Sequence, residues 1–569
     1  MPRGPLLPAG RGLADPSAGR VSGGLTFRRP LIESSLGGAA GNGAGEDVLD
    51  LRGHMSTRFG FTLLAACALV LIAGPSRAAA KDPVGTPIAG PTPGTAVDPP
   101  PGAVFAPGVD ALYMGQAVTE TPGDVAGESY LSLGLFTFRA WEFKALEVPV
   151  GSRPFDYPKA DTLGTNTPGA SMKYINGVPY DFALRQAQTG YHALNSYRLT
   201  GERYFLLKAQ VQADHLIAIH ASVGGAWFYP SGFYYRFNRT CPELLVPPWY
   251  SGIAQGHAVG FFARLYEATG KKVYKDAAEH TLESFLVRRG AGHPWVSQVD
   301  GSGYLRVEEY PGTGWGFVFN GHMAAAMGLW DYYRVTHDAR ALALYKGAMT
   351  SVVRYGDRFR TKGWISAYSL GARALFGHYH VLVMRQMRQL YTISGDARFI
   401  HLMDHFDDDY PAPLVSGVVK VLPGEYKTYR FSATGARLAT CTIHPRAEKL
   451  YGVDLRKRVF GQSGVWLRIT SGSLKGYFIR EAMGHVYIPG AVNALPYDPP
   501  VRVTLRVGQW TARQFDAHGA MLASQTIDIP SAQAAKASQR AIINGTPQVL
   551  LASDPFADFW VPRRAVILP

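Results

Sequence analysis

From Phe182 to Phe406, apolar residues recur every three to four positions, which is the spacing of helices with one buried face. The phrase Tyr-x-x-Thr-Gly, or a close variant of it, interrupts this pattern four times and ends at Gly201, Gly270, His337 and Gly395. Each copy follows one apolar stretch and precedes another, so it marks a tight turn between two antiparallel helices. This internal repeat predicts about four helical hairpins in an α/α toroid, an incomplete α/α barrel, within a mainly α protein with β additions.

The connections between the hairpins are long. If the four tight turns lie at one end of the toroid, the return segments 224–250, 290–319 and 356–379 gather at the other end. These segments hold most of the unusual residues of the chain, which are Trp227, Tyr229, Trp249, Tyr250, Glu308, Glu309, Tyr310, Pro311, Trp315, Tyr368, Arg373 and Tyr379. The topology therefore predicts a single mouth lined by aromatic and carboxylate side chains.

The apolar stripes of the hairpins define the predicted core. Methionine and aromatic residues at helical spacing are assigned to packing and not to a cofactor. For the second to fourth hairpins the predicted core residues are Ala254, Ala258, Phe261, Phe262, Leu265, Tyr274, Ala278, Leu282, Phe285, Met323, Ala326, Met327, Trp330, Leu342, Tyr345, Met349, Val352, Val383, Met387, Leu390, Phe399, Leu402, Met403 and Phe406.

Outside the helical region, 181–412, the pattern has a period of two. Alternation in the segments 465–470, 477–479 and 501–507 indicates strands, so we expect a β-rich domain over 415–530. Its role is either glycan binding or shielding of one flank of the toroid. Residues 531–569 are expected to form a C-terminal tail, and the aromatic stretch within 126–180 a short β and loop segment that leans on the toroid.

The N-terminal part has the features of an export signal. Residues 1–54 lack periodicity, which indicates disorder or a start codon that lies further on. In 55–80, Arg58 precedes an apolar run and Ala78-Ala79-Ala80 provides a small-residue cleavage site. Residues 81–125 are expected to be an extended Pro/Gly linker. We therefore expect export to the periplasm or the medium, with membrane contact only through the signal or an uncleaved signal anchor.

Charge favours an acidic partner. The chain has 57 basic and 43 acidic residues and a formal charge of +14. Because the basic residues are scattered, with no nucleic-acid-binding motif, we expect an acidic polysaccharide and no nucleic acid. Aromatic residues make up 12% of the chain, and aromatic faces suit sugars. The possibility of a homodimer stays open.

We expect neither a metal nor a cofactor. No phosphate-binding or dinucleotide motif occurs, and Cys241 and Cys441 are too few for a metal cluster or a disulfide framework, although they could form one bridge. The segment His401-Leu-Met-Asp404-His405 is the nearest approach to a metal motif, but we assign it to the last helix. The adjoining Asp407-Asp408-Asp409 is interpreted as a solvated helix end.

The strongest candidate for chemistry combines Glu308, Glu309, Tyr310, Tyr368 and Tyr379. Adjacent carboxylates repel each other, and burial raises the pKa of a carboxyl group, so one of the two glutamates is suited to stabilise developing negative charge. A tyrosine is a weak base unless a nearby cation or hydrogen bond lowers its pKa, but it is well suited to return a proton to a carbanion.

Several motifs in this region, in this order, resemble the catalytic domain of the D-glucuronyl C5-epimerases over about 170–410. These motifs are Pro248-Trp249-Tyr250-Ser251-Gly252-Ile-Ala-Gln255-Gly256, Glu308-Glu309-Tyr310-Pro311, Phe319-Asn320-Gly321, Gly328-Leu329-Trp330-Asp331-Tyr332-Tyr333 and Tyr379-His380. The resemblance implies proton abstraction at C5 of a glucuronic acid unit in a heparan-type chain, followed by reprotonation from the opposite face.

The resemblance also implies residue roles. Glu309, Tyr368 and Tyr379 match the acid/base positions of the family. Tyr310 and Asn320 match its cleft lining, and neither metal nor nucleotide is required. We further expect Tyr250 and Arg373 to bind substrate, with Arg373 as a cation near the tyrosines.

The chain departs from the family pattern at several positions. Tyr368 is followed by Ser369-Leu370-Gly371 in place of Asp-Leu-Arg, so Arg373 is displaced by two places. Val383 replaces a histidine, and His257 replaces a glutamine. These departures leave carboxylate recognition and the identity of the substrate open, including the polymer and its sulfation. Independently of them, a polysaccharide lyase, which eliminates after the same proton abstraction, and a non-catalytic glycan-binding protein are the alternatives.

Overall fold

The structure of the protein is a computed structural model that describes residues 127–156, 169–235, 243–411, 416–516 and 518–568. The N-terminal start (1–54), the signal peptide (55–80), the linker (81–125) and Cys241 lie outside the described residues. Within them, Cys441 is a free thiol. No helix in the described ranges is long and apolar enough to cross a membrane.

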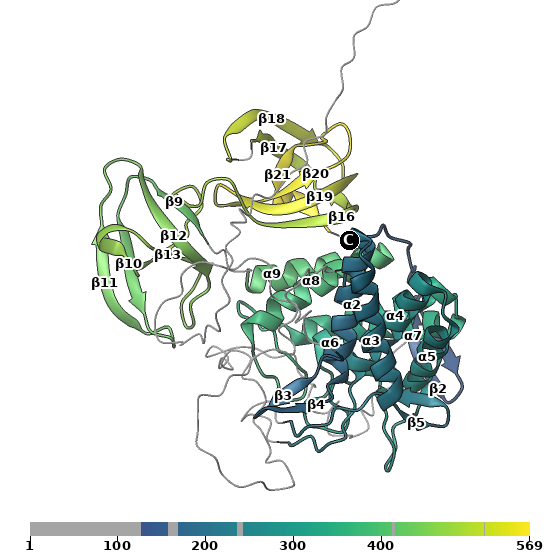
Figure 1. Ribbon diagram of the computed structural model, residues 1–569. Helices are drawn as coiled ribbons and strands as arrows, with labels where there is room; N and C mark the ends of the chain where they lie inside the picture. Colours follow the sequence, from purple (N-terminus) through teal and green to yellow (C-terminus); the bar gives the residue numbers. More distant parts are fainter. Residues whose placement is uncertain (1–126, 157–168, 236–242, 412–415, 517, 569) are drawn as a thin grey trace, which may run out of the picture. The chain divides into compact units, whose positions relative to one another are not determined.

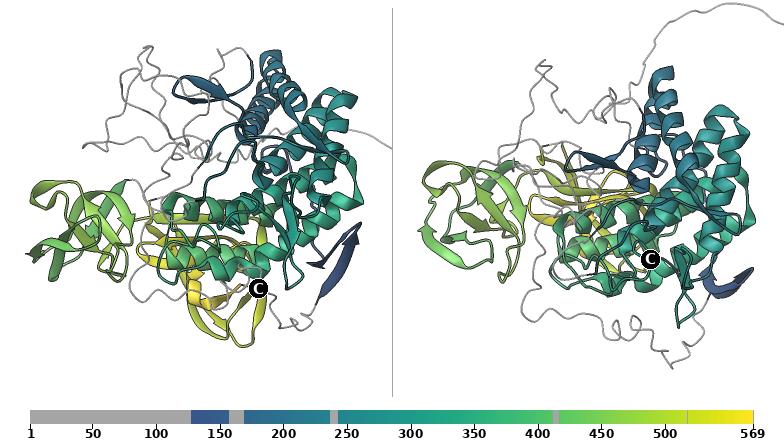
Figure 2. Two further views of the ribbon diagram at one scale, coloured as in Figure 1. Left: turned by 90° about the horizontal axis from the view of Figure 1, so that it is seen from below. Right: turned by 60° about the horizontal axis from the view of Figure 1, so that its bottom comes forward.

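The described residues contain eight α-helices, which pair in sequence order (Figure 1). They are α2 (Ala183–Thr200), α3 (Arg203–Ile219), α4 (Gly252–Thr269), α5 (Lys272–Glu283), α6 (Phe319–Thr336), α7 (Ala339–Tyr355), α8 (Gly377–Ser394) and α9 (Arg398–Asp409). Helix α4 contacts α2 and α6, and α6 contacts α8, so the first helices of the four pairs form one layer. Their partners follow them in antiparallel hairpins, and Figure 2 shows the helices as one packed group in both of its views. The predicted helical hairpins with β structure after them are confirmed.

The repeated phrase forms an equivalent cap at the end of the first helix of each pair, and we call these helices, α2, α4, α6 and α8, the inner helices. Gly201, Gly270, His337 and Gly395 adopt left-handed backbone conformations, and each N–H donates to the carbonyl of the tyrosine four residues earlier. The Thr or Ser hydroxyl donates to the carbonyl four residues before it, as Thr200 does to Ser196 at 2.9 Å. That hydroxyl also accepts the N–H of the residue two places on, as from Glu202 at 3.1 Å. These local bonds end the helix and turn the chain.

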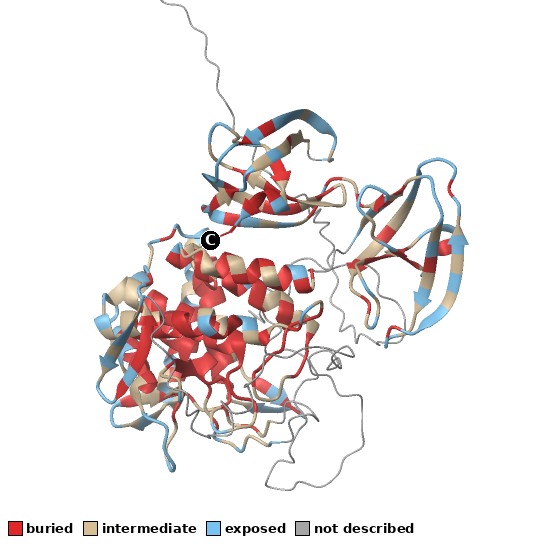
Figure 3. Cartoon of the chain, turned by 180° about the vertical axis from the view of Figure 1, so that it is seen from behind, coloured by how far each residue is buried: buried red, intermediate tan, exposed pale blue. Residues whose placement is uncertain are grey.

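Helices α4 and α6 pack together unusually closely. A β-carbon on Gly256 would collide with the backbone of Ala325, and one on Gly328 would collide with the carbonyl of Gly256. Residues 252–265 and 319–332 are consequently buried without a break, as the dense buried zone of Figure 3 illustrates. Of the predicted core residues, all are buried except Leu342, which is half-buried.

A buried ion pair joins the same two helices. Arg264 donates Nε to Asp331 Oδ1 at 2.9 Å, and Tyr191 donates its hydroxyl to Oδ2 at 2.8 Å. Both charged side chains are 2% exposed. Burial raises the pKa of Asp331, while Arg264 opposes that shift. Asp331 therefore has a structural role in the motif that carries the family resemblance.

Short antiparallel hairpins occupy the segments before and between the helix pairs. They are β1 (Glu128–Leu133) with β2 (Phe136–Trp141), β3 (Lys173–Ile175) with β4 (Val178–Tyr180), β5 (Ala221–Val223) with β6 (Ala226–Phe228), and β7 (Ser297–Val299) with β8 (Leu305–Val307). Strand β2 packs on α7. Backbone bonds cross-link the return segments, for example from Phe319 N to Tyr368 O at 3.1 Å. The predicted gathering of these segments is confirmed by such contacts.

Two seven-stranded sheets follow the helices. The first contains β9 (Gly417–Val421), β10 (Tyr426–Phe431), β11 (Arg437–Ile443), β12 (Lys449–Lys457), β13 (Trp466–Ile469), β14 (Phe478–Arg480) and β15 (Val486–Tyr487). The second contains β16 (Ala491–Leu505), β17 (Gly508–Phe515), β18 (Met521–Ile529), β19 (Gln533–Ile543), β20 (Thr546–Leu551), β21 (Trp560–Pro562) and β22 (Val566–Ile567). The expected tail at 531–569 is wrong, because β19 is a central strand that pairs with β16 and β20.

The acidic end of α9 is not a solvated helix end, which corrects a second expectation. Asp407 and Asp409 are buried. Arg540 of β19 reaches Asp404 at 3.3 Å, Asp407 at 3.0 Å and Asp408 at 2.5 Å. Asp404 and Asp407 therefore form a buried ionic contact between α9 and the second sheet, while Asp408 is exposed and Asp409 pairs with Arg360.

Candidate active site

The two adjacent glutamates after β8 point to different surroundings. Glu308 Oε1 accepts from Gln298 Nε2 at 2.7 Å, and its Oε2 accepts the backbone N–H of Phe317 at 2.6 Å. Both carboxylate oxygens of Glu308 therefore hold the loop. Glu309 instead contacts tyrosines, so the predicted pair divides into one structural and one chemically available carboxylate.

Glu309 is held by the first turns of two inner helices. Its carbonyl accepts from Ser251 Oγ at 2.7 Å, at the start of α4. Its carboxylate packs against Gly321 in the first turn of α6, where a β-carbon would collide with Oε2. Within the described part of the chain, Oε2 is buried and has no hydrogen-bond partner.

Burial raises the pKa of Glu309 to about 7, and hydrogen bonds from Tyr310 and Tyr368 oppose the shift. Repulsion by Glu308, which the sequence suggested, is not among the causes. A carboxyl group with this pKa is present in both protonation states near neutral pH, so it can accept and return a proton.

Tyr310 and Tyr368 form hydrogen bonds to Glu309, and Tyr379 packs on Tyr368. Tyr368 donates its hydroxyl to Glu309 Oε1 at 3.2 Å and lies 3.4 Å from the hydroxyl of Tyr310. The ring of Tyr379 contacts that of Tyr368 with 4.3 Å between centroids and a tilt of 49°. The geometry thus brings together Glu309, Tyr310, Tyr368 and Tyr379, which we call the carboxylate–tyrosine cluster.

The backbone fixes Tyr368 and Tyr379 independently. Tyr368 lies at the start of a short loop, which is closed by a hydrogen bond from its N–H to Ala374 O at 2.7 Å. Its carbonyl accepts from Phe319 N, at the start of α6. Tyr379 lies in the first turn of α8 and not in the return segment to which it was assigned.

Burial and the neighbouring carboxylate raise the pKa values of Tyr310 and Tyr368 well above their usual range. Both phenols therefore keep their protons at neutral pH unless a base removes them. In this arrangement Glu309 is the proton acceptor and Tyr368 is a proton donor bonded to it. The cluster can move protons to and from a weak carbon acid.

The other predicted site residues are more dispersed. Asn320 is buried beside Gly321, and neither atom of its side-chain amide has a partner among the described residues. Tyr250 is half-buried, and its ring contacts Phe228. Arg373 has a left-handed backbone and donates Nη1 to Arg358 O at 3.1 Å. The substrate-binding roles of these residues stay predictions.

Two residues beside the cluster were not singled out from the sequence. The ring of His378 lies 4.1 Å from that of Tyr379, and burial lowers the pKa of His378 to about 4. The ring of Tyr235 stacks on that of Tyr310 at 5.9 Å. His378 could have been found from the sequence, because it directly precedes the matched motif Tyr379-His380. Nothing in the local sequence marked Tyr235.

Several residues that carry the family resemblance have structural roles. Gln255 accepts from Tyr229 N at 3.1 Å and donates to Trp227 O at 2.8 Å. His380 accepts from Ser366 N at 3.0 Å, and its Nε2 lies 2.9 Å from Tyr410 O. These side chains fix the return segments that position the cluster.

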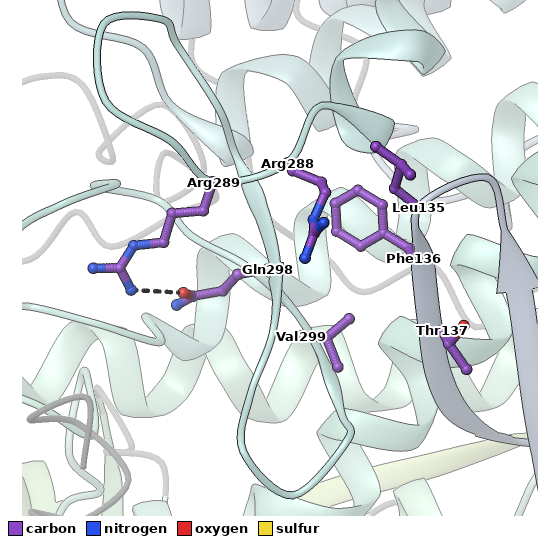
Figure 4. A pocket seen from close by; sticks show the side chains of 7 residues that line it. All are labelled: Leu135, Phe136, Thr137, Arg288, Arg289, Gln298 and Val299. Carbon is purple, nitrogen blue, oxygen red and sulfur yellow. Dashed lines mark hydrogen bonds between the residues drawn. The ribbon is translucent and has the colours of Figure 1, made fainter. Parts of the chain in front are cut away.

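A pocket of about 440 Å³ lies between the β1–β2 hairpin and the segment that follows α5 (Figure 4). Its lining residues are Leu135, Phe136, Thr137, Arg288, Arg289, Gln298 and Val299. Arg289 donates to Gln298, which in turn donates to Glu308. The pocket is therefore connected to the loop of Glu309, although the cluster residues do not line it.

The region of His401 and Asp404 has no geometry for a metal. The rings of His401 and His405 are 4.1 Å apart, and Arg360 lies against His405. Across the described residues, no three His, Cys, Asp or Glu side chains are placed to hold a metal ion.

Known proteins resemble parts of this chain. Residues 229–408 match the family described as D-glucuronyl C5-epimerase C-terminus. An uncharacterized protein of Methanocaldococcus jannaschii is 27% identical over 168 residues, which is 29% of this chain and 54% of that protein. The D-glucuronyl C5-epimerase of Caenorhabditis elegans is 33% identical over 124 residues, or 21% of this chain and 18% of that protein. The matches thus span about half of one curated relative and under a fifth of the other.

Among solved structures, the cellobiose 2-epimerase of Bacillus thermoamylovorans is 14% identical with a TM-score of 0.30, covering 40% of this chain and 59% of that one. A D-mannose isomerase is 11% identical with a TM-score of 0.30, covering 42% of this chain and 64% of that one. The matched segment 229–408 holds every member of the carboxylate–tyrosine cluster. Residues 229–408 are thus the part of this chain that matches the family described as D-glucuronyl C5-epimerase C-terminus.

Proposed function

We propose that the protein is an epimerase that inverts C5 of D-glucuronic acid units, to L-iduronic acid, within an acidic polysaccharide. The family of residues 229–408 and the partial similarity to a D-glucuronyl C5-epimerase support this proposal. The net positive charge of the chain favours a polyanionic substrate. Export of the protein and closure of its four hairpins into an α/α toroid belong to the same proposal.

The observation that carries the proposal is the hydrogen bond from Tyr368 to Glu309, with the ring of Tyr379 in contact with Tyr368. The proton on C5 of a uronate is weakly acidic, because its removal adds negative charge beside an ionised carboxylate. A buried carboxylate with a pKa of about 7 is a suitable base, and protonated phenols can donate hydrogen bonds to the enolate-like intermediate.

Inversion needs a second proton carrier that reaches the opposite face of the sugar. Because the rings of Tyr368 and Tyr379 contact each other, a sugar ring does not fit between them. We therefore infer that the uronate lies at the hydroxyl ends of these two residues. Glu309 with Tyr368 then serves one proton transfer, and Tyr379 serves the other.

The experiment is exchange with solvent deuterium. Purified protein is incubated with heparosan in deuterated water, and NMR locates the incorporated label. Deuterium at C5 together with iduronate and without shortening of the polymer is the expected result. Unsaturated ends that absorb in the ultraviolet would instead identify a polysaccharide lyase, which shares the first step. Binding without label would leave only a glycan-binding function.

Three variants test the roles of the residues. Glu309→Gln, Tyr368→Phe and Tyr379→Phe should each lower the exchange rate by about 100-fold or more, because each removes a proton carrier. Tyr345→Phe is the matched control, since Tyr345 is equally buried but donates its hydroxyl to Lys144 O in the core. An unchanged rate in Glu309→Gln would contradict the proposal.

A further inference from the structure

Lys173 of β3 has surroundings that are unusual for a cation. Its side chain is buried, with 6% of the residue exposed. The ammonium lies over three aromatic rings, at 4.3 Å from the centroid of Phe233, 5.5 Å from Phe182 and 5.7 Å from Tyr235. We call these three residues the aromatic cage of Lys173.

No carboxylate among the described residues pairs with this ammonium, and none of their polar atoms accepts a hydrogen bond from it. Burial lowers the pKa of Lys173 to about 8, and the nearby Arg185 adds to the shift. Ring faces attract a cation, but they replace only part of its lost hydration. A buried cation without a counterion therefore destabilises the fold, and an anionic ligand would complete the site.

The cage is continuous with the carboxylate–tyrosine cluster. Tyr235 stacks on Trp249 with 5.6 Å between centroids and on Tyr310 with 5.9 Å. The hydroxyl of Tyr310 lies 3.4 Å from that of Tyr368. Tyr235 thus contacts the ammonium of Lys173 as well as the cluster, and the ammonium is one aromatic ring beyond Tyr310.

We propose that Lys173 forms a subsite that binds the carboxylate of a uronate unit neighbouring the one that reacts. This inference rests on the proposed function. An extended acidic polymer carries carboxylates on successive uronate units, and the cage offers it a cation beside the partly exposed ring of Tyr235. Because Tyr235 separates Lys173 from Tyr310, the ammonium is assigned to the neighbouring unit and not to the reacting one.

The first test measures binding and turnover of Lys173→Met with heparosan. Loss of a charge-assisted contact should raise KM by about 10- to 100-fold and leave kcat within about twofold. An unchanged KM would overturn the inference. A loss confined to kcat would overturn it too, because the ammonium would then act on the reacting unit.

Lys457 of β12 offers a matched control. It lies 5.9 Å from the ring centroid of Phe478, and burial lowers its pKa as well, but it belongs to the first C-terminal sheet. Lys457→Met should bind heparosan as the unaltered protein does. An equal loss of affinity in both variants would overturn the subsite, since general loss of positive charge would explain it.

Two further measurements separate the inference from folding and from the reaction. Lys173→Met should unfold at the same or a higher temperature, because it removes an uncompensated buried charge. A lower Tm with unaltered binding would assign Lys173 a structural role and overturn the subsite. Calorimetric titration with heparosan and with its carboxyl-reduced form needs no turnover. If the unaltered protein prefers the carboxylate form through Lys173 but exchanges no label, the subsite stands and the proposed reaction fails.

Discussion

Gly321 provides the surface against which the carboxylate of Glu309 packs. A β-carbon at residue 321 would occupy the position of Glu309 Oε2. Glycine is therefore required here by a close approach and not by a special backbone conformation. The first turn of α6 thus positions the proposed base directly.

Gly321→Ala should displace the carboxylate of Glu309 and lower the exchange rate by about 100-fold, because small displacements of a positioned group are costly. The measurement is kcat for deuterium incorporation into heparosan. Gly377→Ala is the control: Gly377 also lies in the first turn of an inner helix, and no atom lies within 4 Å of the added carbon. It should retain activity and gain about 0.5–1 kcal/mol of stability. Equal activity of the two variants would contradict the positioning role.

Glu309 should make both activity and stability depend on pH. Activity that needs its ionised form should rise as the pH passes about 7, the raised pKa of Glu309. The contribution of Glu309 to stability changes with pH in the opposite direction, because it falls as the pH rises. The folded protein binds the proton more tightly than the unfolded chain, so this contribution is complete below the unfolded pKa of 4.5 and is lost as the pH rises through about 7.

Replacement of Glu309 by glutamine should remove that loss. At pH 8, Glu309→Gln should be more stable than the unaltered protein by up to about 3 kcal/mol, and the difference should vanish near pH 4.5. Denaturant unfolding at the two pH values measures it. Glu308→Gln, which disturbs the bonds from Gln298 and Phe317, should instead be destabilised. A stability difference independent of pH would contradict the assignment.

His337 occupies a left-handed position, with φ of 56°, that glycine occupies in the three other turns. His337→Gly should raise the free energy of unfolding by about 0.5–1 kcal/mol, because non-glycine residues are strained there. The reciprocal Gly270→His should lower it, since no atom crowds Gly270 and only the backbone conformation matters. Thermal unfolding of the two variants provides the comparison. A stabilised Gly270→His would refute the capping argument.

Arg540→Met should cost about 3–5 kcal/mol of stability, because the buried carboxylate of Asp407 loses its paired cation and that of Asp404 keeps only its contact with Arg563. The loss should diminish in acid, since protonation removes the uncompensated charges, and burial already raises the pKa of Asp407. Calorimetry at pH 7 and pH 4 measures both effects. Lys272→Met breaks an exposed pair with Asp276 and should change stability by less than about 0.5 kcal/mol.

The helical hairpins could be predicted from the sequence because their information is local. A tyrosine and a hydroxyl residue in fixed spacing, followed by glycine in three turns and by His337 in the other, specify each cap. The stripe of Phe261, Phe262 and Leu265 specifies a buried face. Strands are specified by partners far along the chain. The alternation in 501–507 indicated β16, but nothing local showed that β19 pairs with it, and so 531–569 was misassigned.

The same distinction applies to the site. The order of the motifs identified Glu309, Tyr368 and Tyr379 as candidates. That Glu308 is structural is shown only by the structure, in which its carboxylate accepts the N–H of Phe317. Charge also misled: Asp407 follows the pattern of an exposed helix end but meets Arg540 from a distant strand. The aromatic cage of Lys173 could not be predicted from the sequence either, because its rings come from other segments of the chain.

The four equivalent caps also have a consequence for how such a chain can change its substrate. Each helix cap depends only on hydrogen bonds within about six residues of its own turn, as the cap at Gly201 shows. Insertions or replacements in the segments at the far ends of the helices leave those bonds untouched. Such a chain can acquire a new substrate through changes in the segments at one end of its helices, while the capped turns at the other end keep the helix pairs in register.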